Sequence, residues 1–145
     1  MTKIIDKLSV LLADTYALYL KTQNYHWHVT GPQFKTLHEL FEMHYSELAD
    51  AVDELAERIR ILGHNAPATF KEFERLKTIG DGDANASANQ MVVDLHADHK
   101  KLIEDLNVAI EEAQTLNDEG SIALLSERIA SHEKARWMLG VSREG

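Results

Sequence analysis

Apolar residues recur along this chain three, four and seven positions apart, which is the period of one face of an α-helix. The pattern predicts four long helices, over about residues 3–28, 34–62, 87–115 and from residue 117 or 118 to just before Gly140. No stretch alternates as a β-strand would. The residues expected in the core are Ile4, Leu8, Leu11, Thr15, Leu18, Tyr25, Phe34, Leu37, Phe41, Leu48, Leu55, Ile59, Leu62, Met91, Leu95, Leu102, Leu106, Ile110, Ala113, Ile122, Leu125, Ile129 and Trp137.

Glycine, proline and capping residues mark the ends of these segments. Residues 29–32 (Val-Thr-Gly-Pro) end the first helix, and Gly63 follows the second at a natural stop. Thr69 and Glu72 have the spacing of a capping box and predict a short helix that ends near residue 77. Four long helices, with one short helix crossing between the second and the third, predict an all-α four-helix bundle.

Length and composition indicate one globular domain over residues 1–145. No apolar run approaches the length of a membrane span, and the first residues lack the pattern of a signal peptide, so we expect a cytoplasmic protein with no membrane partner. The absence of cysteine excludes disulfides, thiolate metal sites and thiol catalysis. The net charge of −9 argues against broad attraction to nucleic acid and favours cations, although solubility alone also explains an acidic balance.

Two pairs of potential metal ligands lie on the predicted second helix. His38 and Glu42 are four residues apart, and so are Asp53 and Glu57, so the members of each pair share one helix face. The eleven residues from Glu42 to Asp53 turn the helix by about 20° net but advance it by roughly 16 Å. The two pairs therefore face the same way but lie too far apart to share one ion, and each is half of a site.

A second copy of the chain offers the missing halves. The motif that completes a di-iron centre inside one bundle, Glu-x-x-His, is absent, because no histidine has a glutamate three positions before it. The two pairs are, however, symmetric about positions 47–48. If this helix meets its own copy antiparallel there, His38 and Glu42 face Asp53 and Glu57 of the partner subunit, which creates two identical sites.

His26 is a further candidate ligand. It and His38 are equally far from Pro32, so a hairpin between the first two helices places them near the same level. Two imidazoles and three carboxylates suit Fe(II), Mn(II) or Zn(II) better than Ca(II) or a thiophilic metal. The spacing alone leaves open the alternative that the acids form a solvated surface and the histidines only pack.

One long motif links the predicted hairpin to the acidic pairs. It runs through residues 24–34 (Asn-Tyr-His-Trp-His-Val-Thr-Gly-Pro-Gln-Phe) and 37–42 (Leu-His-Glu-Leu-Phe-Glu) to Asp53, residues 57–58 and Gly63. An Arg-Trp-Met run lies near the end of the chain. In these features the chain resembles, over essentially its whole length, the Dps family of the ferritin-like superfamily (DNA-binding protein from starved cells, or miniferritin).

The resemblance implies a hollow dodecameric shell that oxidises Fe(II) with hydrogen peroxide or dioxygen, stores the ferric mineral and so protects against oxidative stress. The implied ligands of each one-iron or two-iron site at a twofold interface are His26, His38 and Glu42 of one subunit with Asp53 and Glu57 of its partner. A shell that binds zinc or manganese without redox turnover is the alternative. The family often has aspartate in place of Glu42, so the longer side chain is expected to displace or weaken the second iron position.

Residues beside these ligands carry further expectations. The resemblance places Trp27 next to the site, where it either donates an electron that limits radical release or packs at the hairpin. His28 is expected to be a surface group rather than an extra ligand. Asp118 and Glu119 either line an iron entry pore or cap the last helix.

Some Dps relatives bind DNA through lysine-rich terminal arms, and this chain lacks such an arm. Only Lys3 and Lys7 lie near its start, and residues 141–145 hold a single basic residue. Because the chain is acidic overall, we expect no DNA binding at physiological salt.

Overall fold

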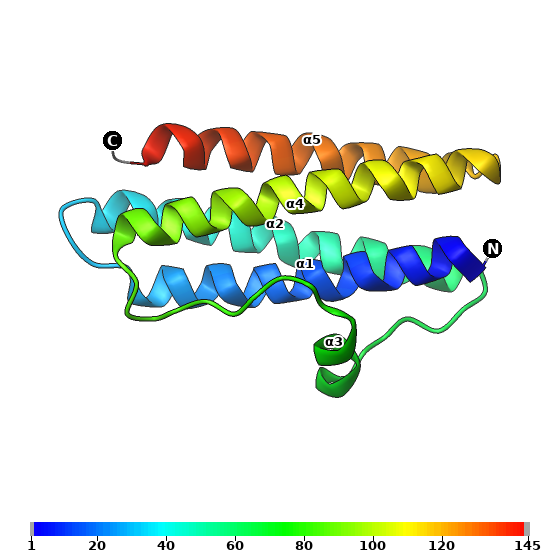
Figure 1. Cartoon of the computed structure of the whole chain (residues 1–145), viewed down its shortest axis with the longest axis horizontal. Helices are drawn as coiled ribbons and strands as arrows, with labels where there is room; N and C mark the ends of the chain where they lie inside the picture. The colour runs from blue at the N-terminus through cyan, green and yellow to red at the C-terminus, as the bar shows by residue number, and fades with distance from the viewer. Residues whose placement is uncertain (1, 144–145) are drawn as a thin grey trace.

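The structure is a computed structural model that describes residues 2–143. That range folds into α1 (Thr2–His28), α2 (Phe34–Ile61), α3 (Phe70–Leu76), α4 (Ala88–Thr115) and α5 (Glu119–Ser142). No residue between 2 and 143 lies in a strand. The predicted all-α fold, a four-helix bundle with a short crossover helix between its second and third long helices, is therefore confirmed (Figure 1).

Two antiparallel hairpins make up the bundle. One consists of α1 and α2, the other of α4 and α5, and the hairpins pack lengthwise against each other (Figure 1). The segment 62–87 runs along the bundle and carries α3 on its outside, so α2 and α4 point in the same direction. The start of α1 and the end of α5 lie at opposite ends. Met1 and residues 144–145, the extremes of the predicted domain and of the predicted tail, lie outside the described residues.

The predicted helix boundaries are mostly confirmed. Thr69 accepts a hydrogen bond from the backbone N–H of Glu72 at 3.1 Å and donates its hydroxyl to the Glu72 carboxylate at 3.0 Å, which is the capping box. Gly63 has a φ of +90°, the left-handed conformation expected just after a helix. The prediction that the last helix stops before Gly140 is wrong, because α5 continues to Ser142. Burial of the neighbouring Leu139 offsets the roughly 1 kcal/mol that an internal glycine costs.

The bundle core contains most of the residues predicted for it, from Ile4 of α1 to Leu125 of α5. Two predictions are wrong, since Phe34 is 44% and Trp137 is 63% exposed. The buried face of α5 instead consists of Ser121, Leu125, Arg128, His132, Ala135 and Leu139. Trp137 is two residues from both Ala135 and Leu139, which turns it about 200° away from that face.

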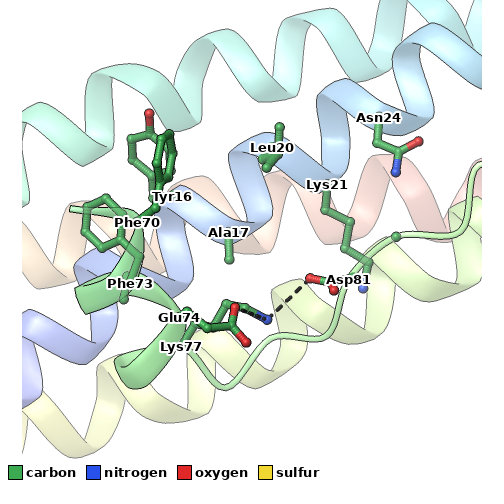
Figure 2. A pocket seen from close by; sticks show the side chains of 12 residues that line it. Tyr16, Ala17, Leu20, Lys21, Asn24, Phe70, Phe73, Glu74, Lys77 and Asp81 are labelled. Carbon is green, nitrogen blue, oxygen red and sulfur yellow. Dashed lines mark hydrogen bonds and ion pairs between the residues drawn. The ribbon is translucent and has the colours of Figure 1, made fainter. Parts of the chain in front are cut away.

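The crossover segment is attached to α1 on the side away from α5. The buried Asp14 carboxylate accepts hydrogen bonds from the backbone N–H groups of Thr78, at 2.6 Å, and Ile79, at 3.0 Å. Phe73 of α3 stacks on Tyr16 of α1 with ring centroids 4.8 Å apart. A groove of about 410 Å³ lies between these helices, and Figure 2 shows the side chains around it; none of the predicted metal ligands lines this groove. Within residues 2–143, no helix is both long and apolar enough to cross a membrane.

Candidate metal centre

The two candidate histidine ligands lie side by side at the tip of the first hairpin. His26 is in the last turns of α1 and His38 is in the second turn of α2. Their rings stack with centroids 3.8 Å apart and an interplanar angle of 13°. The shared level that their equal distance from Pro32 predicts is therefore present in the structure.

Each of these histidines is held by the backbone of the other. The Nδ1 atom of His26 lies 2.7 Å from the carbonyl oxygen of His38, and the Nδ1 atom of His38 lies 2.7 Å from the carbonyl oxygen of His26. Because a carbonyl oxygen only accepts, each Nδ1 carries the hydrogen and donates it. In the neutral imidazoles both Nε2 atoms then keep their lone pairs, and the carbonyls fix the ring orientation as partners of metal-binding histidines commonly do.

Glu42 joins this pair from the next turn of α2. Its carboxylate oxygen is 3.8 Å from the Nε2 atom of His26, beyond hydrogen-bonding distance, so the two donors face a shared space. Aromatic rings enclose the imidazoles: Phe34 stacks on His38 at 4.9 Å, and Tyr45 meets His26 edge-on at 5.3 Å. The sequence pattern predicted Phe34 for the core and did not indicate this enclosure, although Phe34 is four residues before His38 on the same helix face.

Asp53 and Glu57 do not reach this cluster within one subunit. Both are exposed farther along α2, as its length requires. Across residues 2–143, no group of three or more histidine, cysteine, aspartate or glutamate side chains is placed to hold a metal ion. Within the subunit, His26 therefore lies beside both His38 and Glu42, while Asp53 and Glu57 are separate and open to solvent.

Trp27 and His28 both point away from the bundle core. Trp27 is 60% exposed, so it does not pack into the hairpin of its own subunit. The exposed His28 donates from Nδ1 to the backbone and side-chain oxygens of Asn24, each at 2.8 Å. This places His28 at the surface of the hairpin.

The Asp118 carboxylate has a local structural role at the start of α5. It accepts a hydrogen bond from the backbone N–H of Ser121 at 3.1 Å and pairs with Arg58 of α2 at 2.7 Å. Partial burial raises the pKa of Asp118, but the hydrogen bonds from Ser121 and the charge of Arg58 outweigh it, and the net pKa is lowered. Of the two roles considered for this residue, the structure contains the helix cap, whereas Glu119 remains exposed.

Comparison with known families agrees with this architecture. The family model of the ferritin-like domain matches residues 5–141, nearly the whole of the described bundle. The bundle, the crossover helix and the family match define this chain as a ferritin-like protein.

Individual relatives narrow the class. DNA protection during starvation protein 2 of Bacillus anthracis is 38% identical over 137 residues, which cover 94% of each chain. Dps from Staphylococcus aureus superposes with a TM-score of 0.96 at 32% identity, over 100% of this chain and 97% of that one. This chain belongs to the Dps family.

A third comparison concerns the metal chemistry of the class. Dps from Vibrio cholerae O1, described as a member of a broad superfamily of ferritin-like diiron-carboxylate proteins, matches with a TM-score of 0.93 and 31% identity. The match covers 97% of this chain and 88% of that one. Family membership supports iron storage and protection as the general role of this chain.

Proposed function

We propose that this protein oxidises Fe(II) with hydrogen peroxide or dioxygen at sites shared between two subunits, and stores the ferric product inside a dodecameric shell in the cytoplasm. The observation that carries the proposal is the His26–His38 pair. Both Nδ1 atoms are committed to carbonyl oxygens, so both Nε2 atoms are left for a metal ion, and that of His26 lies 3.8 Å from the Glu42 carboxylate. These contacts support a half-site at the tip of the α1–α2 hairpin.

The second half of each site comes from α2 of the partner subunit. An antiparallel crossing of two α2 helices near positions 47–48 brings the exposed Asp53 and Glu57 of the partner subunit to His26, His38 and Glu42. The combined set has two imidazoles and three carboxylates, a mixture that suits Fe(II). The carboxylates stabilise Fe(III) more than Fe(II), because their attraction grows with the charge of the ion.

The reaction removes the two reagents that together generate hydroxyl radical. Two Fe(II) ions each give one electron to hydrogen peroxide, which takes up two protons and leaves as two water molecules. The exposed Trp27 lies next to His26 in the chain and is proposed to give up an electron when a radical forms near the site. The ferric ions then mineralise against carboxylates on the inner surface of the shell.

Mixing two inactive variants tests whether the sites are shared. His38→Ala and Asp53→Ala are each expected to abolish rapid Fe(II) oxidation in the pure state. A dimer containing one chain of each kind has one doubly damaged site and one intact site. Co-assembly of equal amounts should therefore restore about a quarter of the wild-type rate in stopped-flow absorbance after Fe(II) and peroxide are added.

Each outcome has a definite meaning. If co-assembly restores no activity although mass spectrometry finds mixed dimers, the shared site is ruled out. If wild-type protein binds Fe(II) but produces no ferric absorbance with either oxidant, the zinc- or manganese-binding shell without redox turnover is the better description. The double variant His38→Ala, Asp53→Ala with unchanged oxidation would contradict a role for these ligands altogether.

A further inference from the structure

A second group of histidines lies inside the bundle, away from the candidate iron ligands. His44 of α2, His99 of α4 and His132 of α5 are all buried. Both ring nitrogens of His44 lack a hydrogen-bond partner, and so does Nε2 of His99. A buried polar atom without a partner costs free energy, so an unsatisfied imidazole inside a core calls for an explanation such as a missing ligand.

Two of these histidines, His44 and His99, border a pocket between α2 and α5. The pocket has a volume of about 200 Å³ and is lined by Met43, His44, Glu47, His99, Ser131, Lys134, Ala135 and Met138. Two of the four methionines of the chain therefore contribute to one small pocket that also contains the unpartnered His44. Thioether sulfur and imidazole nitrogen are both present, and methionine side chains are flexible enough to adapt to a bound atom.

A hydrogen bond donated by Arg128 to His132 determines, through His132, which nitrogen of His99 carries a proton. Arg128 lies 3.1 Å from Nε2 of His132 and can only donate, so that nitrogen accepts. The hydrogen of His132 is then on Nδ1, which donates to Nδ1 of His99 at 2.8 Å. His99 therefore carries its hydrogen on Nε2. Burial, reinforced by neighbouring histidines and Arg128, lowers the pKa of His99 to about 3, so its ring stays neutral with a single N–H.

This arrangement limits the donors that a metal ion finds in the pocket. His99 offers an N–H rather than a lone pair, and Glu47 is engaged in an ion pair with Arg128. The donors that remain are the Ser131 hydroxyl, the two thioethers of Met43 and Met138, and one ring nitrogen of His44. A hard or borderline divalent ion, such as Mn(II) or Fe(II), prefers more oxygen and nitrogen ligands than this.

We propose that the pocket between α2 and α5 binds a soft monovalent cation, Cu(I), through the sulfur atoms of Met43 and Met138 and the imidazole of His44. Thioethers select Cu(I) over hard and borderline divalent ions. A single positive charge is also less costly to bury than two. Glu47 neutralises the adjacent Arg128, and the other cation of the lining, Lys134, is exposed to solvent.

The proposed copper pocket is separate from the candidate iron ligands on the same helix. Met43 and Glu47 are four residues apart and lie on one flank of α2. Met43 is one residue after Glu42, so its side chain is turned about 100° from that of Glu42 around the helix axis. A second α2 docked over Glu42 and Asp53 therefore leaves the Met43 flank beside the interface rather than at its centre.

The test measures soft-metal binding to iron-free assembled protein. Ag(I), a redox-inert probe for Cu(I), is titrated into protein carrying ¹³C-labelled methionine methyl groups, and Cu(I) affinity is measured by competition with a chromophoric chelator under reducing conditions. We expect one equivalent per chain, with shifts in the methyl signals of Met43 and Met138 but not of the core residue Met91. The double variant Met43→Leu, Met138→Leu keeps side-chain volume and should bind Cu(I) at least about tenfold more weakly.

Matched controls separate this site from the iron site. Met91→Leu removes a sulfur elsewhere in the core and should leave Cu(I) affinity unchanged. Asp53→Ala should lose Fe(II) oxidation but keep the Ag(I)-induced methyl shifts. The proposal is overturned if the methyl signals of Met43 and Met138 do not respond, if the leucine double variant keeps full affinity, or if Asp53→Ala abolishes the response. The proposed iron oxidation is tested separately, by the stopped-flow assay of co-assembled variants.

Discussion

At the scale of single residues, the exchange of hydrogen bonds between His26 and His38 governs the chemistry of the candidate iron site. The carbonyl oxygens accept from Nδ1 of each ring and so select the tautomer whose Nε2 is open to a metal ion. The sequence indicated that both residues lie at the same level of the hairpin. It did not indicate which ring nitrogen is available to a metal ion, because the spacing of side chains does not predict which backbone carbonyls they contact.

Comparing alanine substitutions of His38 and His28 should show which histidine of the hairpin is needed for Fe(II) oxidation. We expect His38→Ala to slow Fe(II) oxidation by at least about tenfold, because it removes a ligand and the group that holds His26. His28→Ala is the matched control, since His28 is exposed and bonds only to Asn24. Initial rates of ferric absorbance at equal protein concentration measure both. Equal rates in the two variants would contradict the assignment.

At the scale of helices, the composition of α5 explains why its apolar pattern gave a wrong prediction for Trp137. On its buried face, the polar residues Arg128 and His132 lie between the apolar residues Leu125 and Leu139. The apolar periodicity of this helix is therefore weak, and it wrongly predicts that the exposed Trp137 belongs to the core. These polar residues are tolerated in the core because Arg128 pairs with Glu47 of α2 and hydrogen-bonds His132 on its own helix, while His132 hydrogen-bonds His99 of α4.

The buried histidines between α4 and α5 should make stability depend on pH. Burial lowers the pKa of His99 to about 3 and that of His132 well below its ordinary value, so both are neutral when folded. The unfolded chain binds protons below about pH 6.5, so stability is fully present above that pH and falls as the pH drops toward the folded pKa. His99 alone should cost roughly 2 kcal/mol at pH 5.

Urea denaturation at pH 7 and pH 5, at one protein concentration, measures this effect. His99→Gln keeps a neutral hydrogen-bonding side chain without the titration, so its stability should fall less between the two pH values. His28→Ala, with its exposed histidine, should retain the full pH dependence. An identical loss in wild-type protein and His99→Gln would show that other groups cause it.

At the scale of the whole molecule, net charge sets the expected behaviour toward DNA. The chain carries a formal charge of −9, and Lys3 and Lys7 are the only basic residues in the first two turns. Because phosphate binding requires many cationic contacts, we expect no gel shift at low micromolar protein in about 0.15 M salt. The same chain with an added lysine-rich arm is the positive control. A shift with the unmodified protein would contradict the expectation.

The sequence alone determined the periodic elements of this protein: the helices, most of their caps, the core of α1 and the spacing of the five candidate iron ligands. These features depend on residues near one another in the chain, whose relation follows from helix geometry. Only the tertiary structure decided the tautomers of His26 and His38, the fate of Trp137 and the buried His44–His99–His132 group. Those features depend on contacts between helices. The backbone carbonyls of the neighbouring helix select the tautomers of His26 and His38, and Glu47 of α2 and His99 of α4 pair with the polar residues of α5.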